Sequence, residues 1–169
     1  MLSRATLEAA YARLERPLFN VLLRWVWGRD EAMDVMHEAF ERVWRRKEKV
    51  DELTLEPLVW KTALNLAANR RRTKKLRTML GFDETEPVAS QMPGSDDQMG
   101  AAQVDQRVRR AIDGLPEKLR SVVVLCELSG LSYEAIATTL DIPIGTVGSR
   151  RAAAMAKLST QLSDLKARA

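Results

Sequence analysis

Residues 131–158 read LSYEAIATTLDIPIGTVGSRRAAAMAKL. Ser132 is a favourable N-cap for a short helix over residues 133–140, and Pro143 can open a second helix after a turn at Asp141. Small or polar residues begin this second helix, so its start can approach a major groove closely. The apolar positions expected to face inward are Val147, Ala154 and Leu158. The pattern predicts a helix-turn-helix, although the spacing alone also fits a plain helical hairpin.

The composition of the chain favours helix over strand. Of its 169 residues, 46% are apolar and only 5% are aromatic, with eight glycines and six prolines. This supply predicts an all-α fold. With one cysteine, Cys126, and one histidine, His37, the usual disulfide, metal and nucleophile arrangements are missing, so we expect no catalytic site, metal or cofactor. No apolar run approaches the roughly 18 residues of a membrane span, so we expect no membrane insertion, and the cysteine usage fits a reducing cytoplasm.

Charge is distributed unevenly along the chain. Residues 1–80 carry 17 basic and 11 acidic side chains, residues 81–104 carry five acidic and no basic ones, and residues 105–169 carry ten basic and seven acidic ones. The middle segment also collects Gly and Pro and lacks apolar periodicity. We therefore expect two small helical domains joined by a flexible linker, with two basic bodies that contact a polyanion. Ordinary solvated surface charge is the alternative.

One N-terminal helix has the pattern of an interaction surface. From Ala32 to Trp44 the apolar residues form an unbroken stripe, and the acids Asp34, Glu38 and Glu41 lie outside it. These acids either face a basic partner or form an ordinary solvated face.

A second N-terminal helix ends in a dense basic segment. Pro17 and Pro57 are each expected to open a helix, because proline suits the first helical turn. The helix after Pro57 carries Asn65 and Asn69, which are four residues apart and hence on one face. Six basic residues follow within residues 70–77, enough to follow a phosphate backbone. Capping a helix end needs fewer charges.

These stretches resemble bacterial sigma factors of the extracytoplasmic-function group. Residues 131–137 and 142–150, with the lead-in at 115–120, are similar to the family's domain four, a helix-turn-helix. EAMDVMHEAF (residues 31–40) looks like its core-polymerase-binding helix, and WKTALNLAAN (residues 60–69) like its promoter-melting helix. Because both domains match in order, the resemblance implies an alternative sigma factor that binds core RNA polymerase and directs promoter recognition, melting and transcription initiation.

The resemblance also implies which residues make these contacts. Core polymerase would meet Asp34, Val35, Glu38, Phe40 and Glu41 in the domain of residues 1–80. The minus-ten promoter region would meet Trp60, Lys61, Asn65, Asn69, Arg70, Arg71, Arg72 and Lys74, with an unpaired base held by residues 47–56. The minus-thirty-five region would meet Thr146, Gly148, Ser149, Arg150 and Arg151 in the domain of residues 105–169.

Tryptophans are confined to the N-terminal half. Trp25 and Trp44 fall on apolar stripes, which predicts a place in the core. Trp60 is the better candidate for stacking on a base, because the family often has an aromatic residue at that position.

The chain departs from the family's pattern at the recognition helix. Gly148 stands where Lys or Arg is usual, Arg151 replaces an apolar residue, and Ala153 and Met155 fill further basic positions. These departures argue against strong recognition of the minus-thirty-five region.

Two alternative functions stay open at this point. One is a free-standing helix-turn-helix regulator whose N-terminal helices dimerise, which would bind duplex DNA without polymerase. The other is an adaptor that docks on polymerase and hardly touches DNA. An anti-sigma factor restrains many members of the family, and the sequence leaves open whether this chain has one.

Overall fold

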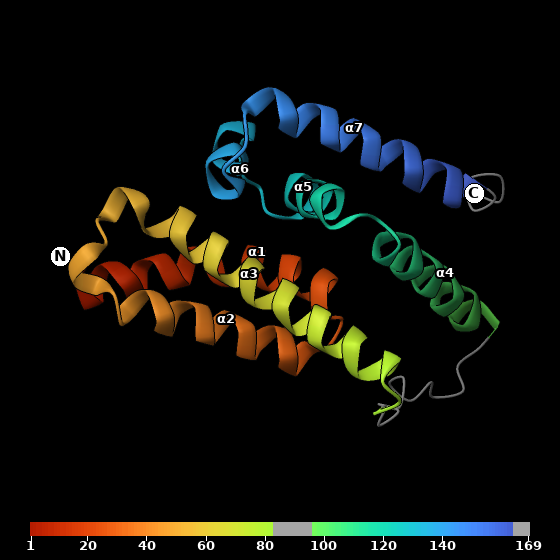
Figure 1. Cartoon of the computed structure of the whole chain (residues 1–169), viewed down its shortest axis with the longest axis horizontal. Coiled ribbons are helices and arrows are strands. Elements are labelled where there is room, and N and C mark those ends of the chain that lie inside the picture. Colours follow the sequence, from red (N-terminus) through yellow and green to blue (C-terminus); the bar gives the residue numbers. More distant parts are fainter. Residues whose placement is uncertain (83–95, 164–169) are drawn as a thin grey trace.

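The computed structural model describes residues 1–82 and 96–163, with side chains in the second range described from residue 103 onward. Within these ranges the regular structure is helical and contains no strand, which confirms the all-α prediction (Figure 1). In chain order the elements are α1 (Arg4–Val26), α2 (Arg29–Trp44), the 3-10 turn η1 (Lys47–Lys49), α3 (Glu52–Met79), α4 (Asp96–Asp113), α5 (Glu117–Leu128), α6 (Tyr133–Leu140) and α7 (Ile144–Gln161).

The N-terminal half is a three-helix bundle in which α1, α2 and α3 all pack on one another. Its centre is apolar, with Leu18, Val35 and Val59 completely buried, one from each helix. The apolar stripes of the three helices therefore account for this half of the fold.

Both prolines expected to open helices lie inside them instead. Pro17 lies within α1, whose apolar stripe continues from Leu14 to Leu18 across it. Packing of that stripe on α2 and α3 outweighs the lost backbone hydrogen bond. Pro57 lies within α3, which begins at Glu52 because the Asp51 carboxylate accepts the Thr54 N–H at 2.8 Å and caps the helix. This N–H also lowers the pKa of Asp51 from its ordinary value.

The C-terminal half contains the predicted helix-turn-helix. Ser132 Oγ accepts the Ala135 N–H at 3.2 Å and caps α6, as expected. Asp141 makes the turn in the left-handed conformation, with φ 55°, and Pro143 leads into α7. Helix α5 packs on both α6 and α7, and Val147 and Ala154 are fully buried. The motif is therefore a compact three-helix unit rather than an isolated hairpin.

The expected linker of residues 81–104 overlaps helix α4 at its C-terminal end. Helix α4 begins at Asp96, so the end of the predicted linker is helical, and residues 83–95 lie outside the described residues. Within the described chain, none of the helices combines the length and apolar character needed to cross a membrane.

The two halves pack against each other. Helix α6 lies on α3 and helix α5 lies on α1, while α7 runs along the outer edge of the C-terminal half (Figure 1). Helix α7 is therefore the part of the helix-turn-helix most open to an external partner, whereas one side of α1 and α3 faces the C-terminal half.

Candidate nucleic-acid and polymerase interfaces

The predicted polymerase-binding residues separate into two groups on α2. Val35 is fully buried and Phe40 is 5% exposed, and the Phe40 ring packs on the Tyr11 ring with 5.0 Å between centroids. Both residues hold α2 in the bundle, so their prediction as partner contacts does not fit this conformation. They belong to the apolar stripe, which the bundle core already uses. The acids Asp34 and Glu41 are exposed, and Glu38 is half-buried.

Glu38 joins the two predicted interfaces. Its carboxylate accepts a hydrogen bond from Arg70 of α3 at 3.0 Å and forms an ion pair with Arg42 of its own helix at 2.7 Å. Arg70 also donates to the Glu31 carbonyl at 3.5 Å. A residue predicted for polymerase is thus bonded directly to a residue predicted for DNA.

An open groove runs between α2 and α3. Its wider part, of about 660 Å³, lies between the acids Glu31, Asp34 and Glu38 on α2 and a basic wall on α3. That wall is formed by Arg70, Lys74 and Arg77. In this wider part the α3 side is basic, and the α2 side is mainly acidic, with Arg42 as its one basic lining residue.

The groove continues into a smaller pocket of about 180 Å³. Asn65 and Asn69 both line this pocket, which confirms that they share one face of α3. The pocket is also lined by Arg42, in the last turn of α2, and by Arg46, which follows α2 and precedes η1. Sequence reasoning missed these two arginines because basic residues at a helix C-terminus are ordinary complements of the helix dipole. The pocket therefore combines amides, which can read a base, with guanidiniums, which attract phosphate.

Trp60 does not offer a stacking surface in this structure. Its side chain is 1% exposed, and its Nε1 has no hydrogen-bond partner among the described residues. The ring is instead one of the largest side chains of the core, so the predicted stacking role conflicts with its burial. Lys61, the next residue, is exposed. As expected, Trp25 lies in the core, and the partly buried Trp44 packs against the core.

The segment expected to hold an unpaired base is mostly helical. Within residues 47–56, η1 takes the first three positions, Val50 is buried and Asp51 already caps α3. An open hollow of about 560 Å³ lies beside it and is lined by residues 45–49, chiefly long charged side chains. The segment therefore presents charge, with few groups suited to reading a base.

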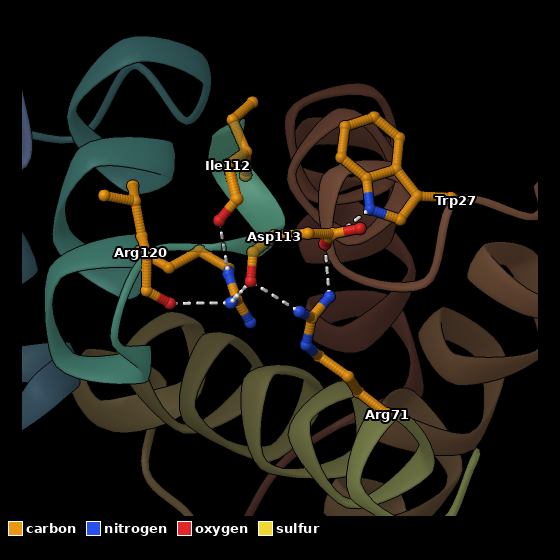
Figure 2. Close-up of polar contacts among 6 residues, drawn as sticks. Trp27, Arg71, Ile112, Asp113 and Arg120 are labelled. Carbon is orange, nitrogen blue, oxygen red and sulfur yellow. Dashed lines mark hydrogen bonds and ion pairs between the residues drawn. The ribbon is translucent and has the colours of Figure 1, made fainter. Parts of the chain in front are cut away.

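The basic end of α3 meets the C-terminal half of the molecule. Arg71 forms an ion pair with the Asp113 carboxylate at the end of α4 and donates to the Asp113 carbonyl at 3.0 Å (Figure 2). Arg72 lies 3.8 Å from Glu117 of α5 and stays 64% exposed, and Lys74 is also exposed. Of the two arginines, Arg71 is therefore held more tightly than Arg72 by contacts within the chain.

On α7 the predicted duplex-reading residues lie near its start. Ser149 is exposed, whereas Thr146, Gly148 and Arg150 are half-buried. Arg151 pairs with Glu127 of α5 at 2.8 Å, an intramolecular contact that its sequence position did not reveal.

Gly148 has room for a side chain. A Cβ placed on Gly148 would lie 3.9 Å from the Tyr133 ring, an ordinary van der Waals distance. The fold of this chain therefore does not itself demand glycine here.

In the described part of the chain, no three His, Cys, Asp or Glu side chains are grouped so that they could hold a metal ion. His37 Nε2 lies 3.2 Å from the Tyr11 hydroxyl, and burial raises the pKa of the Cys126 thiol.

Known proteins are similar to this chain in both sequence and fold. Residues 105–158 match the family model for sigma-70, region 4. The chain is 31% identical over 148 residues to the ECF RNA polymerase sigma-E factor of Haemophilus influenzae, which covers 82% of this chain and 78% of that protein. It is 30% identical over 147 residues to the sigma-E factor of Escherichia coli (strain K12), with 82% and 76% coverage.

A mycobacterial relative is longer. The chain is 29% identical over 134 residues to the ECF RNA polymerase sigma factor SigE of Mycolicibacterium smegmatis, covering 79% of this chain and 52% of that protein. The matched segment thus spans about half the length of that relative.

Solved structures agree on the fold. The chain superposes on CnrH, solved in complex with the cytosolic domain of CnrY, with a TM-score of 0.71, 20% identity and coverage of 96% of this chain and 90% of that one. It superposes on the sigma factor RpoE of Bartonella quintana, solved with the anti-sigma factor NepR, with a TM-score of 0.59, 22% identity and coverage of 94% and 92%. These two structures show the fold, and the matched region with the sigma-E relatives shows the family: the chain belongs to the extracytoplasmic-function sigma factors of the sigma-70 family, alternative sigma factors that bind core RNA polymerase and promoter DNA and direct transcription initiation.

Proposed function

We propose that the two halves divide promoter recognition between them. In residues 1–80, the acidic face of α2 binds core polymerase and the groove between α2 and α3 binds the minus-ten strand. In residues 105–169, the start of α7 binds the minus-thirty-five duplex. The chain itself catalyses no covalent reaction, because the free energy of binding alone drives strand separation.

The continuous groove between α2 and α3 carries this proposal. The wide part and the small pocket share Arg42, Leu66 and Asn69 as lining residues, so a single strand can follow one path past both. Single-stranded nucleic acid is typically held by positive charge along its backbone and by groups that contact bases. The amides of Asn65 and Asn69 can donate to and accept from a base, and Arg42, Arg46 and Lys74 can attract phosphates.

The polymerase contact is supported by charge and exposure. Asp34 and Glu41 are exposed on the same helix, and Glu38 lies beside them at the rim of the groove. Rim charges of this kind steer association and fix the orientation of a partner. The buried Val35 and Phe40 support the helix from behind and are left out of the proposed contact.

Promoter opening by reconstituted holoenzyme tests the groove. The double variant Asn65→Ala, Asn69→Ala should bind core polymerase like the wild type but show strongly reduced permanganate reactivity of minus-ten thymines, because its groove cannot hold the separated strand. Asn20→Ala is a matched control, since Asn20 is an exposed amide on α1 outside the groove. Wild-type opening by the double variant would contradict the proposal.

A further inference from the structure

A polar cluster joins the two halves of the molecule around Asp113. Arg71 of α3 binds both its carboxylate and its carbonyl, and Trp27 Nε1 donates to the same carboxylate at 3.0 Å (Figure 2). Arg120 of α5 donates to the Asp113 carbonyl at 2.6 Å. One residue of the C-terminal half is therefore bound by two side chains of the N-terminal half.

Asp113 occupies an unfavourable place for an acid. It is the last residue of α4, where the helix dipole disfavours negative charge. The Arg71 guanidinium and the Trp27 indole supply the missing compensation across the boundary between the halves. The carboxylate is thus better stabilised when the halves are together than when they are apart.

Trp27 is held in position by the same contact. It follows α1 in the left-handed conformation, with φ 61°, which a bulky residue rarely adopts. The guanidinium of Arg24 in α1 lies 5.5 Å from the centre of its ring, and that of Arg109 in α4 lies 5.1 Å from it. The C-terminal half therefore contributes both a hydrogen-bond acceptor and a cation to this residue.

Positive charge is in excess around the cluster. Arg120 is 4% exposed and lies over the Trp25 ring at 5.5 Å, and its pKa is lowered by burial and by the nearby Arg71. Arg71 and Arg120 both bind Asp113, and without its carboxylate these two guanidiniums would repel each other across the boundary between the halves. Asp113 therefore favours closure, in addition to the Arg72–Glu117 ion pair and the packing of α5 on α1 and of α6 on α3.

We propose that Asp113, with Arg71 and Trp27, forms an internal latch: in the free chain its carboxylate holds the two halves together and occupies Arg71 in place of a promoter phosphate. The second part rests on the proposed function, which assigns Arg71 to the DNA backbone. A carboxylate and a phosphate offer the same kind of acceptor to a guanidinium. Binding of DNA along α3 then requires that the latch opens.

Small-angle X-ray scattering of the free full-length chain tests the closure. Asp113→Asn keeps the shape of the side chain and removes its charge, so it should increase the radius of gyration relative to the wild type. Glu56→Gln is the matched control, because it neutralises an acid that pairs with Arg13 at 2.6 Å within the N-terminal half. It should leave the scattering unchanged. A compact Asp113→Asn variant, indistinguishable from the wild type, would overturn the latch and leave the proposed function untouched.

Binding of a single-stranded minus-ten oligonucleotide to the free chain tests the competition. Asp113→Asn should bind several-fold more tightly than the wild type, because Arg71 is released. Arg71→Ala should open the chain to the same extent but bind the oligonucleotide more weakly than the wild type. The two variants should therefore have the same radius of gyration and opposite changes in affinity for DNA. An open Arg71→Ala variant that binds like the wild type would overturn the competition and the phosphate role of Arg71. Transcription by wild-type holoenzyme tests the proposed function separately.

Discussion

The two helices that carry most of the predicted DNA contacts, α3 and α7, differ in how the folded chain engages their charged side chains. On α3, Arg70 and Arg71 are bound by Glu38 and Asp113, acids from other parts of the chain. On α7, Arg151 is also paired, but with Glu127 of the neighbouring α5 in the same half, and Ser149 is exposed. The comparison indicates that strand binding by α3 needs a rearrangement of its ion pairs, while duplex reading by α7 needs less.

The largest expected effect concerns Trp60 of α3. It tests whether this residue belongs to the core or to the DNA-binding surface of the helix. Trp60→Ala should lower the free energy of unfolding by about 3–5 kcal/mol, because it empties a fully packed site. Urea denaturation measures this loss. Lys61→Ala, at the exposed neighbour, should change stability by no more than about 0.5 kcal/mol. If Trp60→Ala is nearly as stable as the wild type, Trp60 is not a core residue and is again a candidate for stacking on a base.

A charge reversal on α2 tests whether its acidic face binds polymerase. Glu38→Lys should weaken affinity for core polymerase on the order of tenfold, equivalent to about 1.4 kcal/mol, because a favourable rim charge becomes repulsive. Circular dichroism should show unchanged helical content. Glu8→Lys is the control, since Glu8 also pairs with an arginine, Arg4, but lies on α1. If the variant binds core polymerase as strongly as the wild type, the acidic face is solvated and does not contact polymerase.

Salt dependence tests the phosphate contacts at the end of α3. Arg71→Ala and Arg72→Ala should each flatten the dependence of holoenzyme–promoter affinity on salt by about one unit, because each removes one phosphate contact. The free-energy loss should be similar for promoters of different sequence. Titrations at several salt concentrations measure both quantities, and an unchanged slope would remove these arginines from the DNA interface.

The smallest expected effect lies on α7, at Gly148. Gly148→Arg should strengthen binding to duplex DNA that carries the natural upstream element, because it adds a charged contact. Gly148→Ala should recover only helix propensity, worth up to about 1 kcal/mol. A Cβ fits at this position, since the Tyr133 ring atom that it would approach is 3.9 Å away. If both variants bind more weakly, and Arg more so than Ala, DNA or polymerase must approach the glycine closely.

The sequence was most informative where local chemistry decides structure. Ser132 and Pro143 predicted where α6 and α7 begin, and the apolar stripe predicted α2, because capping and periodicity act within a few residues. The same local reasoning misplaced Pro17 and Pro57, since tertiary packing and the Asp51 cap extend their helices. Local rules therefore predict helix existence better than helix limits.

Residues that act across the fold were harder to predict. Val35, Phe40 and Trp60 fit the family's functional helices, yet each is needed to fill the bundle core. The partners of Arg71 lie 42 residues away at Asp113, and no local pattern connects them. An acid at the last position of α4 was the one detectable sign that Asp113 has a distant cationic partner.

Run-off transcription with purified core polymerase tests the division of labour between α3 and α7 most directly. It compares Asn65→Ala, Asn69→Ala with Ser149→Ala, Arg150→Ala on a duplex promoter and on the same promoter with an unpaired minus-ten region. The account predicts that the pre-opened template partly restores transcription by the α3 variant, because strand separation is already accomplished, and leaves the defect of the α7 variant unchanged. An equal response of both variants to the pre-opened template would contradict it.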